Sequence, residues 1–107
     1  MTLKVPKEMD SFQNITFTEY EVNNVHLQNT NEVKKDKDNT EVVLRSILFI
    51  DSRLSNPKLD YMALEKEAEK NKATLRVVID GLDYEVLTVD EVPNIPYGVH
   101  HYELGLV

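Results

Sequence analysis

The segment "VVLRSILFID", residues 42–51, is the strongest strand sequence in the chain. Alternate residues of a strand point to opposite faces, and both faces of this segment are largely apolar. One face carries Val42, Leu44, Ser46, Leu48 and Ile50, and the other carries Val43, Arg45, Ile47 and Phe49. A strand with two apolar faces is central in its sheet or covered on both sides. The segment therefore predicts a strand that is either central in its sheet or covered on both faces.

Further segments alternate β-branched or aromatic residues with polar ones, as half-buried strands do. They are "ITFTEYEV" (15–22), "VHLQ" (25–28), the two arms of "TLRVVIDGLDYEVLTV" (74–89) and "VHHYELGLV" (99–107). Asn23 and Asn24 tolerate left-handed backbone and predict a bend between the first two. Asp80-Gly81 is a strong hairpin-turn signal. Short strands joined by local turns favour a mainly β fold, a small β-barrel of about five or six strands.

The remaining segments predict one helix and irregular structure. "KLDYMALEKEAEKNK" (58–72) favours a short surface helix, with Asn56-Pro57 as its cap and first position. Residues 90–98 contain two prolines and a glycine, which predict a loop. Residues 1–14 combine Pro6 with mixed charges and predict a flexible N-terminal arm. Residues 15–107 then form the single domain.

The segment "NTNEVKKDKDNTE", residues 29–41, contains one apolar residue and charges of both signs. Such a composition cannot bury itself, and it predicts a long, mobile polar loop. Long loops in small domains are often functional, and the alternative is a solvated hairpin tip. The candidate interface residues of this loop are Asn31, Glu32, Lys34, Lys35, Asp36, Lys37 and Asp38.

The composition narrows the possible functions. A chain of 107 residues suffices for one compact domain, and 41% apolar residues allow a modest core. The absence of cysteine excludes disulfides, thiolate zinc sites and cysteine nucleophiles. The net charge of −7, without clustered Lys and Arg, argues against tight nucleic-acid binding. The start lacks the apolar region of a signal peptide and the longest apolar run is "SILFI", so we expect a soluble protein.

Two adjacent histidines, His100 and His101, are the candidates for chemistry. On a strand they point to opposite faces, His100 with the apolar row and His101 outward, so they do not easily bind one metal ion. His26, Glu103 or Asp51 add ligands without completing a tetrahedral set. The preferred interpretation is that His100 packs half-buried and His101 faces solvent or a neighbouring subunit.

Catalytic motifs are missing from the sequence. There is no G-x-S-x-G nucleophile pattern, and three scattered glycines do not make a phosphate-binding loop. The carboxylate-rich stretches are typical of solvated surfaces. We therefore expect no enzyme activity, no catalytic residue and no cofactor or metal.

Two segments taken together resemble a known family. They are "LFIDSRLSNP" (48–57) and "HHYELGLV" (100–107), with the hairpin "VIDGLDYEVLTV" (78–89) between them. The pairing resembles the small minor capsid proteins of tailed phages of low-GC Gram-positive bacteria. The order of elements, over residues 15–107, also looks like phage head-completion and head–tail joining proteins, although residues 58–73 depart from the shorter connection expected there. The matching residues, which we interpret as structural, are Phe49, Asp51, Ser55, Asn56, Pro57, Gly81, His100, His101, Tyr102, Glu103 and Leu104.

The resemblance implies a virion protein made in the bacterial cytoplasm. Such proteins form a homo-oligomeric ring beneath the portal, contact portal or adaptor and tail proteins, and let DNA pass without sequence-specific binding. The loop 29–41 is then either a channel gate or a docking element. The alternatives are a tail-side terminator, a cellular SH3- or OB-like interaction module, and a hydrolase with unfamiliar motif spacing.

Overall fold

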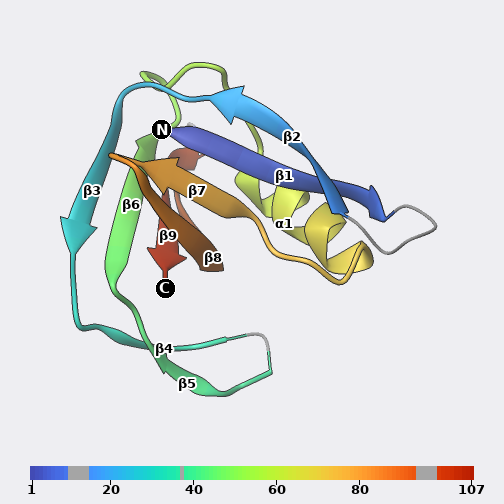
Figure 1. Ribbon diagram of the computed structural model, residues 1–107. Coiled ribbons are helices and arrows are strands. Elements are labelled where there is room, and N and C mark those ends of the chain that lie inside the picture. Colours follow the sequence, from blue (N-terminus) through green and yellow to red (C-terminus); the bar gives the residue numbers. More distant parts are fainter. Residues whose placement is uncertain (10–14, 37, 94–98) are drawn as a thin grey trace.

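The computed structural model describes residues 1–9, 15–36, 38–93 and 99–107. The chain is mainly β with one short helix, as predicted (Figure 1). The elements are β1 (Thr2–Met9), β2 (Ile15–Glu21), β3 (Val25–Asn29), β4 (Val33–Lys35), β5 (Glu41–Val43), β6 (Ser46–Asp51), α1 (Tyr61–Lys70), β7 (Arg76–Ile79), β8 (Leu82–Pro93) and β9 (Val99–Leu106).

Seven strands form one antiparallel sheet in the order β2-β1-β7-β8-β9-β6-β3, and β4 pairs with β5 separately. The long strand β8 belongs to both halves of the large sheet, because its first residues pair with β7 and its later residues pair with β9. Over the described residues this sheet is open, with β2 and β3 at its edges. The barrel closure expected from the sequence is therefore not observed, and the described strands number nine rather than five or six.

The core lies between the two halves of the sheet and α1. In β6 the inward row is the predicted one, and it pairs with β9 through Leu48–Leu104 and Ile50–Tyr102. All four of these side chains are buried. β6 pairs with β3 on one side and β9 on the other, so it is an interior strand, but it lies next to the edge strand β3 and not at the middle of the sheet.

The predicted single strand 42–51 is wrong at its start, because the chain divides it into β5 and β6. Leu44 turns inward and is buried, and the N–H of Arg45 donates to the carbonyl of Leu106. The chain changes pairing partners at this point, because β5 pairs with β4 whereas β6 pairs with β3 and β9. Burial still alternates across the break, since Leu44 and Ser46 are buried and Arg45 between them is exposed.

The predicted flexible arm is also wrong for residues 2–9. They form β1, which pairs with β2 on one side and β7 on the other. Leu3 and Val5 point into the core, while Lys4 points outward towards Glu19. Apolar residues at the alternate positions 3 and 5, with Lys4 between them, therefore marked a half-buried strand rather than an irregular terminus. Residues 10–14 lie outside the described residues.

The helix α1 begins later than the sequence predicts. Its cap is Asp60, whose Oδ1 accepts the N–H of Ala63 at 3.1 Å, and not Asn56-Pro57. α1 buries Tyr61 and Ala68 and contacts β8 and β1. Among the described residues, no helix is both long and apolar enough to cross a membrane.

The hairpin predicted at residues 74–89 is confirmed. Asp80 and Gly81 both have positive φ, +52° and +77°, as the tight turn between β7 and β8 requires. Asn24 likewise adopts φ of 54° at the predicted bend between β2 and β3. β8 continues to Pro93, so the loop predicted at 90–98 is wrong for its first residues, and residues 94–98 lie outside the described part.

Candidate interaction surface

The strands β4 and β5 form a small hairpin that stands apart from the seven-stranded sheet (Figure 1). Their register pairs Val33 with Val43 and Lys35 with Glu41. The predicted mobile loop is therefore ordered over its described residues, and the alternative of a hairpin is confirmed. Lys37 lies outside the described residues.

The hairpin tip is held by one side chain. Oδ1 of Asp36 accepts the N–H of Asp38 and the N–H of Thr40, each at 2.9 Å. The N–H of Asp36 also donates to the carbonyl of Thr40, and Asn39 takes a left-handed φ of 62°. An aspartate that accepts two backbone N–H groups stabilises a tight turn. The tip is consequently a defined structure built from polar residues.

Leu44 anchors the base of the hairpin to the large sheet. It is 1% exposed, and it lies over Gly105 so closely that a Cβ atom there would be 2.9 Å from Leu44 Cδ1. The N–H of Leu44 donates to the carbonyl of Glu32 at 2.9 Å. Gly105 is therefore the residue whose missing side chain makes room for the anchor.

A charged contact ties the hairpin to β8 as well. Lys34 Nζ lies 2.9 Å from Oδ2 of Asp90 and 3.9 Å from Oε1 of Glu32. The hydrogen bond to Asp90 raises the pKa of Lys34 above its usual value, against the effect of partial burial. The Lys34 ammonium group is thus already paired with a carboxylate of its own subunit.

The opposite face of the hairpin is uncovered. Val33 is 55% exposed and Val43 is 58% exposed, and they are directly paired across the two strands. Lys35 and Glu41 extend the same face and are also exposed. Asn31, Glu32 and Asp38, predicted as interface residues, are exposed beside it. The hairpin presents an apolar pair flanked by charges.

A second region gathers aromatic rings across β3, β6 and β9. The Phe49 ring lies 6.0 Å from the ring of His26 and 6.1 Å from the ring of His101, centroid to centroid. Nδ1 of His100 lies 2.9 Å from Nδ1 of His101. The prediction that the two imidazoles point to opposite faces is therefore wrong.

A bulge explains why alternation fails at these histidines. Val92 of β8 pairs with His101, and Pro93 pairs with Val99, so His100 is an additional residue in β9. A bulged residue changes the direction of its side chain. Among the described residues, no group of three or more His, Asp or Glu side chains is placed to bind one metal ion.

Comparisons with family models, with curated proteins and with solved structures find no match for this chain. The resemblance to phage minor capsid proteins therefore stays a prediction.

The residues that carry the resemblance do not form one site. Phe49, Asp51, Tyr102, Glu103 and Leu104 lie together because β6 pairs with β9. Gly81 lies in the distant turn between β7 and β8, so the structure does not bring it to the others.

Three other residues of the pattern close the loop that follows β6. The Ser55 hydroxyl donates to the carbonyl of Asn24 at 2.9 Å, and the N–H of Asn56 donates to Oδ1 of Asn23 at 2.9 Å. Pro57 follows in the same loop. These contacts fasten the loop to the bend between β2 and β3.

Asp51 has a structural role at the start of this loop. Its Oδ1 accepts the N–H of Arg53 at 2.7 Å and the N–H of Leu54 at 3.1 Å. The hydrogen bond from Arg53 is the main reason that the pKa of Asp51 lies below its usual value. A carboxylate engaged in this way stabilises a turn.

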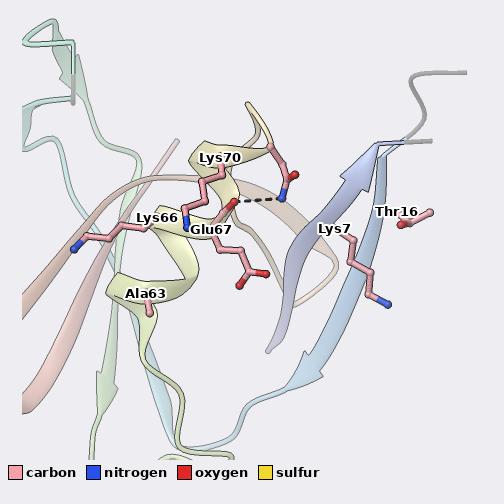
Figure 2. A pocket seen from close by; sticks show the side chains of 7 residues that line it. Lys7, Thr16, Ala63, Lys66, Glu67 and Lys70 are labelled. Atoms are coloured by element: carbon pink, nitrogen blue, oxygen red, sulfur yellow. Dashed lines mark hydrogen bonds between the residues drawn. The ribbon is translucent and has the colours of Figure 1, made fainter. Parts of the chain in front are cut away.

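A wide groove beside the helix was not predicted from the sequence. It is an open groove of about 880 Å³ between α1 and the strands β1 and β2 (Figure 2). Its lining residues are Lys7, Thr16, Ala63, Lys66, Glu67, Lys70 and Asn71. The i, i+4 spacing of Lys66 and Lys70 was the available signal, because it places both on one side of a helix. In Figure 2 the Lys66 side chain extends away from β1, so the lysines edge the groove rather than converge on one point.

A smaller cavity of about 280 Å³ lies beside the start of α1 and includes Tyr61 and Tyr102. The two rings are 5.0 Å apart, centroid to centroid, and burial raises the pKa of both hydroxyls. The hydroxyl of Tyr61 is buried without a hydrogen-bond partner among the described residues. Its raised pKa keeps this group protonated, which makes it a poor base at neutral pH.

Proposed function

We propose that this chain is a structural protein of a tailed-phage virion, a minor capsid protein that forms a homo-oligomeric ring in the head–tail connector. The observation that carries the proposal is the ordered β4–β5 hairpin with its uncovered pair, Val33 and Val43. The sequence resemblance supplies the viral context, and the hairpin supplies a surface suited to assembly.

The exposed valines favour contact with another protein. A two-stranded hairpin is marginally stable alone, and here the anchors Leu44 and Lys34 hold it while its outer face stays open. Apolar side chains exposed together on an ordered element are typical of interaction sites. A subunit that acts by binding neighbours needs such a surface and no reactive cleft.

The shape of the large sheet supports the barrel-like body of this proposal. β8 is shared by the two halves, and the edge strands β2 and β3 are connected by residues 22–24 alone. A strand that passes from one half to the other at a corner is a feature of small barrels and orthogonally packed sheets. We propose that the body is barrel-like, with β8 as one corner and the edge strands β2 and β3 approaching each other at residues 22–24.

The net charge of −7 suits a part of the DNA exit channel. A negatively charged wall repels the phosphate backbone, so a duplex moves past without adhering. DNA would then pass through the ring without sequence-specific binding, and the stable partners would be portal or adaptor and tail proteins.

Deleting the gene from a phage or prophage that carries it tests the proposal. We expect heads that fill with DNA and then leak it or fail to join tails. Expression of the wild-type chain from a plasmid should restore infectious particles. A deletion mutant that packages DNA and joins tails normally overturns the connector assignment and leaves the cellular interaction module as the better interpretation.

A further inference from the structure

We infer that the β4–β5 hairpin of one copy docks into the groove between α1 and β1–β2 of the next copy. This inference rests on the proposed function, since it names the partner surface of the same hairpin. It commits to a second copy of this chain as the occupant.

The groove is a basic surface in an acidic protein. Lys7, Lys66 and Lys70 line it together with one acid, Glu67, although the whole chain has 19 acidic and 12 basic residues. Within the described ranges, none of these three lysines forms an ion pair. Their charges are therefore available to an acidic partner.

Between the lysines, one wall of the groove is formed by a small side chain. Ala63 is exposed, lines the groove and has a single methyl group as its side chain, while Figure 2 shows Glu67 extending from α1 towards β1. A volume of about 880 Å³ accommodates several side chains from a neighbouring molecule. A small apolar residue between basic ones suits a partner with apolar and acidic groups.

The hairpin has those groups. Asp38 and Glu41 are exposed near its tip, and neither carboxylate is in an ion pair within the described part of the chain. Val43 shares the open face with Glu41 and pairs with Val33, while Lys35 lies across from Glu41 on that face and Asp38 lies at the tip. Insertion would cover the valines against α1 and bring the two acids to Lys66 and Lys70.

The two surfaces are separate, which decides the symmetry of the contact. The hairpin follows β3 and leads into β6, whereas the groove lies at α1, β1 and β2 (Figure 1). A contact between two different patches is head-to-tail, and such contacts build rings when the rotation closes. The required geometry is therefore that of a ring subunit and not of a two-fold dimer.

Charge reversal with mixing tests the contact. One variant carries Asp38→Lys and Glu41→Lys, and the other carries Lys66→Glu and Lys70→Glu. Each alone should associate at least about tenfold more weakly than wild type by sedimentation velocity over a concentration series, because like charges meet at the contact. An equimolar mixture should recover wild-type association, since each altered hairpin then meets an altered groove and each native hairpin meets a native groove.

Matched controls separate the contact from general charge and folding effects. The variant Asp83→Lys with Glu91→Lys makes the same charge change at exposed acids outside the hairpin and the groove, and its association should equal that of wild type. The chain has no cysteine, so Asp38→Cys mixed with Lys70→Cys gives an independent readout that needs no charge reversal. That mixture should form a disulfide-linked dimer, and either variant alone should not.

The results separate the two proposals. Any one of three results overturns the hairpin–groove contact. They are an equimolar mixture that does not recover wild-type association, a wild-type chain that stays monomeric, and Asp38→Cys alone cross-linking as well as the cysteine mixture. None of these results bears on the phenotype of the phage lacking the gene, which alone decides the connector assignment.

Discussion

Two antiparallel hairpins of this protein, β7–β8 and β4–β5, are stabilised by different interactions. The β7–β8 turn is Asp80-Gly81, with positive φ at both residues, between strands rich in β-branched residues. The β4–β5 hairpin has strands of three residues each and a polar tip. Local sequence determines the first hairpin, whereas contacts from distant parts of the chain hold the second.

The distant contacts are few and can be identified individually. Lys34 and Asp90 are 56 positions apart in sequence, and Leu44 packs over Gly105. Strands as short as β4 and β5 are unstable without such support. The lesson is that a polar loop becomes an ordered surface when its ends are anchored, and each anchor can be removed separately.

The largest expected effect comes from truncating the apolar anchor. Leu44→Ala should lower the free energy of unfolding by about 2–5 kcal/mol, because it removes a buried side chain and leaves a cavity over Gly105. The matched control is Leu82→Ala in the other hairpin, where the leucine is 54% exposed and the loss should stay below about 0.5 kcal/mol. Urea unfolding measures both, and equal losses would refute the anchoring role of Leu44.

The next effect compares the two glycines that serve the hairpins. At Gly105 a Cβ would lie 2.3 Å from Thr88 Oγ1, so Gly105→Ala should cost about 1–3 kcal/mol through overpacking. At Gly81 there is open space but φ is +77°, so Gly81→Ala should cost about 1–2 kcal/mol through backbone strain.

A double mutant distinguishes these two causes. Gly105→Ala should cost less in the Leu44→Ala background, because one of the clashing side chains is gone. Gly81→Ala should cost the same in both backgrounds. Additive losses for Leu44 and Gly105 would show that the two residues do not share a packing site.

A smaller, local effect is expected at the hairpin tip. Asp36→Ala removes the acceptor of two backbone N–H groups and should destabilise the tip by about 1 kcal/mol. Hydrogen exchange should accelerate about fivefold at the amides of Asp38 and Thr40, while core amides such as that of Leu104 stay unchanged. Unchanged exchange at Thr40 would contradict the account of the tip.

The smallest effect is expected for the charged anchor. Lys34→Met should lower the free energy of unfolding by less than about 1 kcal/mol, because the pair with Asp90 is partly exposed. Lys35→Met, at an exposed position beside it, is the control and should have no measurable effect.

The pH dependence of this difference follows from the raised pKa of Lys34. A folded-state pKa above the unfolded value of about 10.4 means that the pair stabilises the fold fully below that pH. The stabilisation is lost as the pH rises through the folded-state pKa. Wild type and Lys34→Met should therefore converge in stability above about pH 10.4, and a difference that grows there would contradict the pairing.

Local signals in the sequence predicted much of the fold. The Asp-Gly turn, the Asn pair at the bend and the alternation of the final strand each determine the backbone of nearby residues. The inward row of β6 followed from the same alternation. These features required no knowledge of distant contacts.

The features that the sequence did not predict all depend on long-range packing. β1 is ordered because β2 and β7 pair with both its sides, and the strand 42–51 divides because β5 pairs with β4 whereas β6 pairs with β3 and β9. The imidazoles of His100 and His101 meet because β9 has one residue more than β8 at that point. The basic groove forms only when α1 lies beside β1, so its lysines gave no signal as a site.

The most direct test of the central claim is electron cryomicroscopy of particles from a phage that carries this gene. The account predicts a ring of copies between portal and tail, in which β4 and β5 of each copy contact α1 of its neighbour. A connector that lacks this chain, or a ring in which Val33 and Val43 face only solvent, would contradict it.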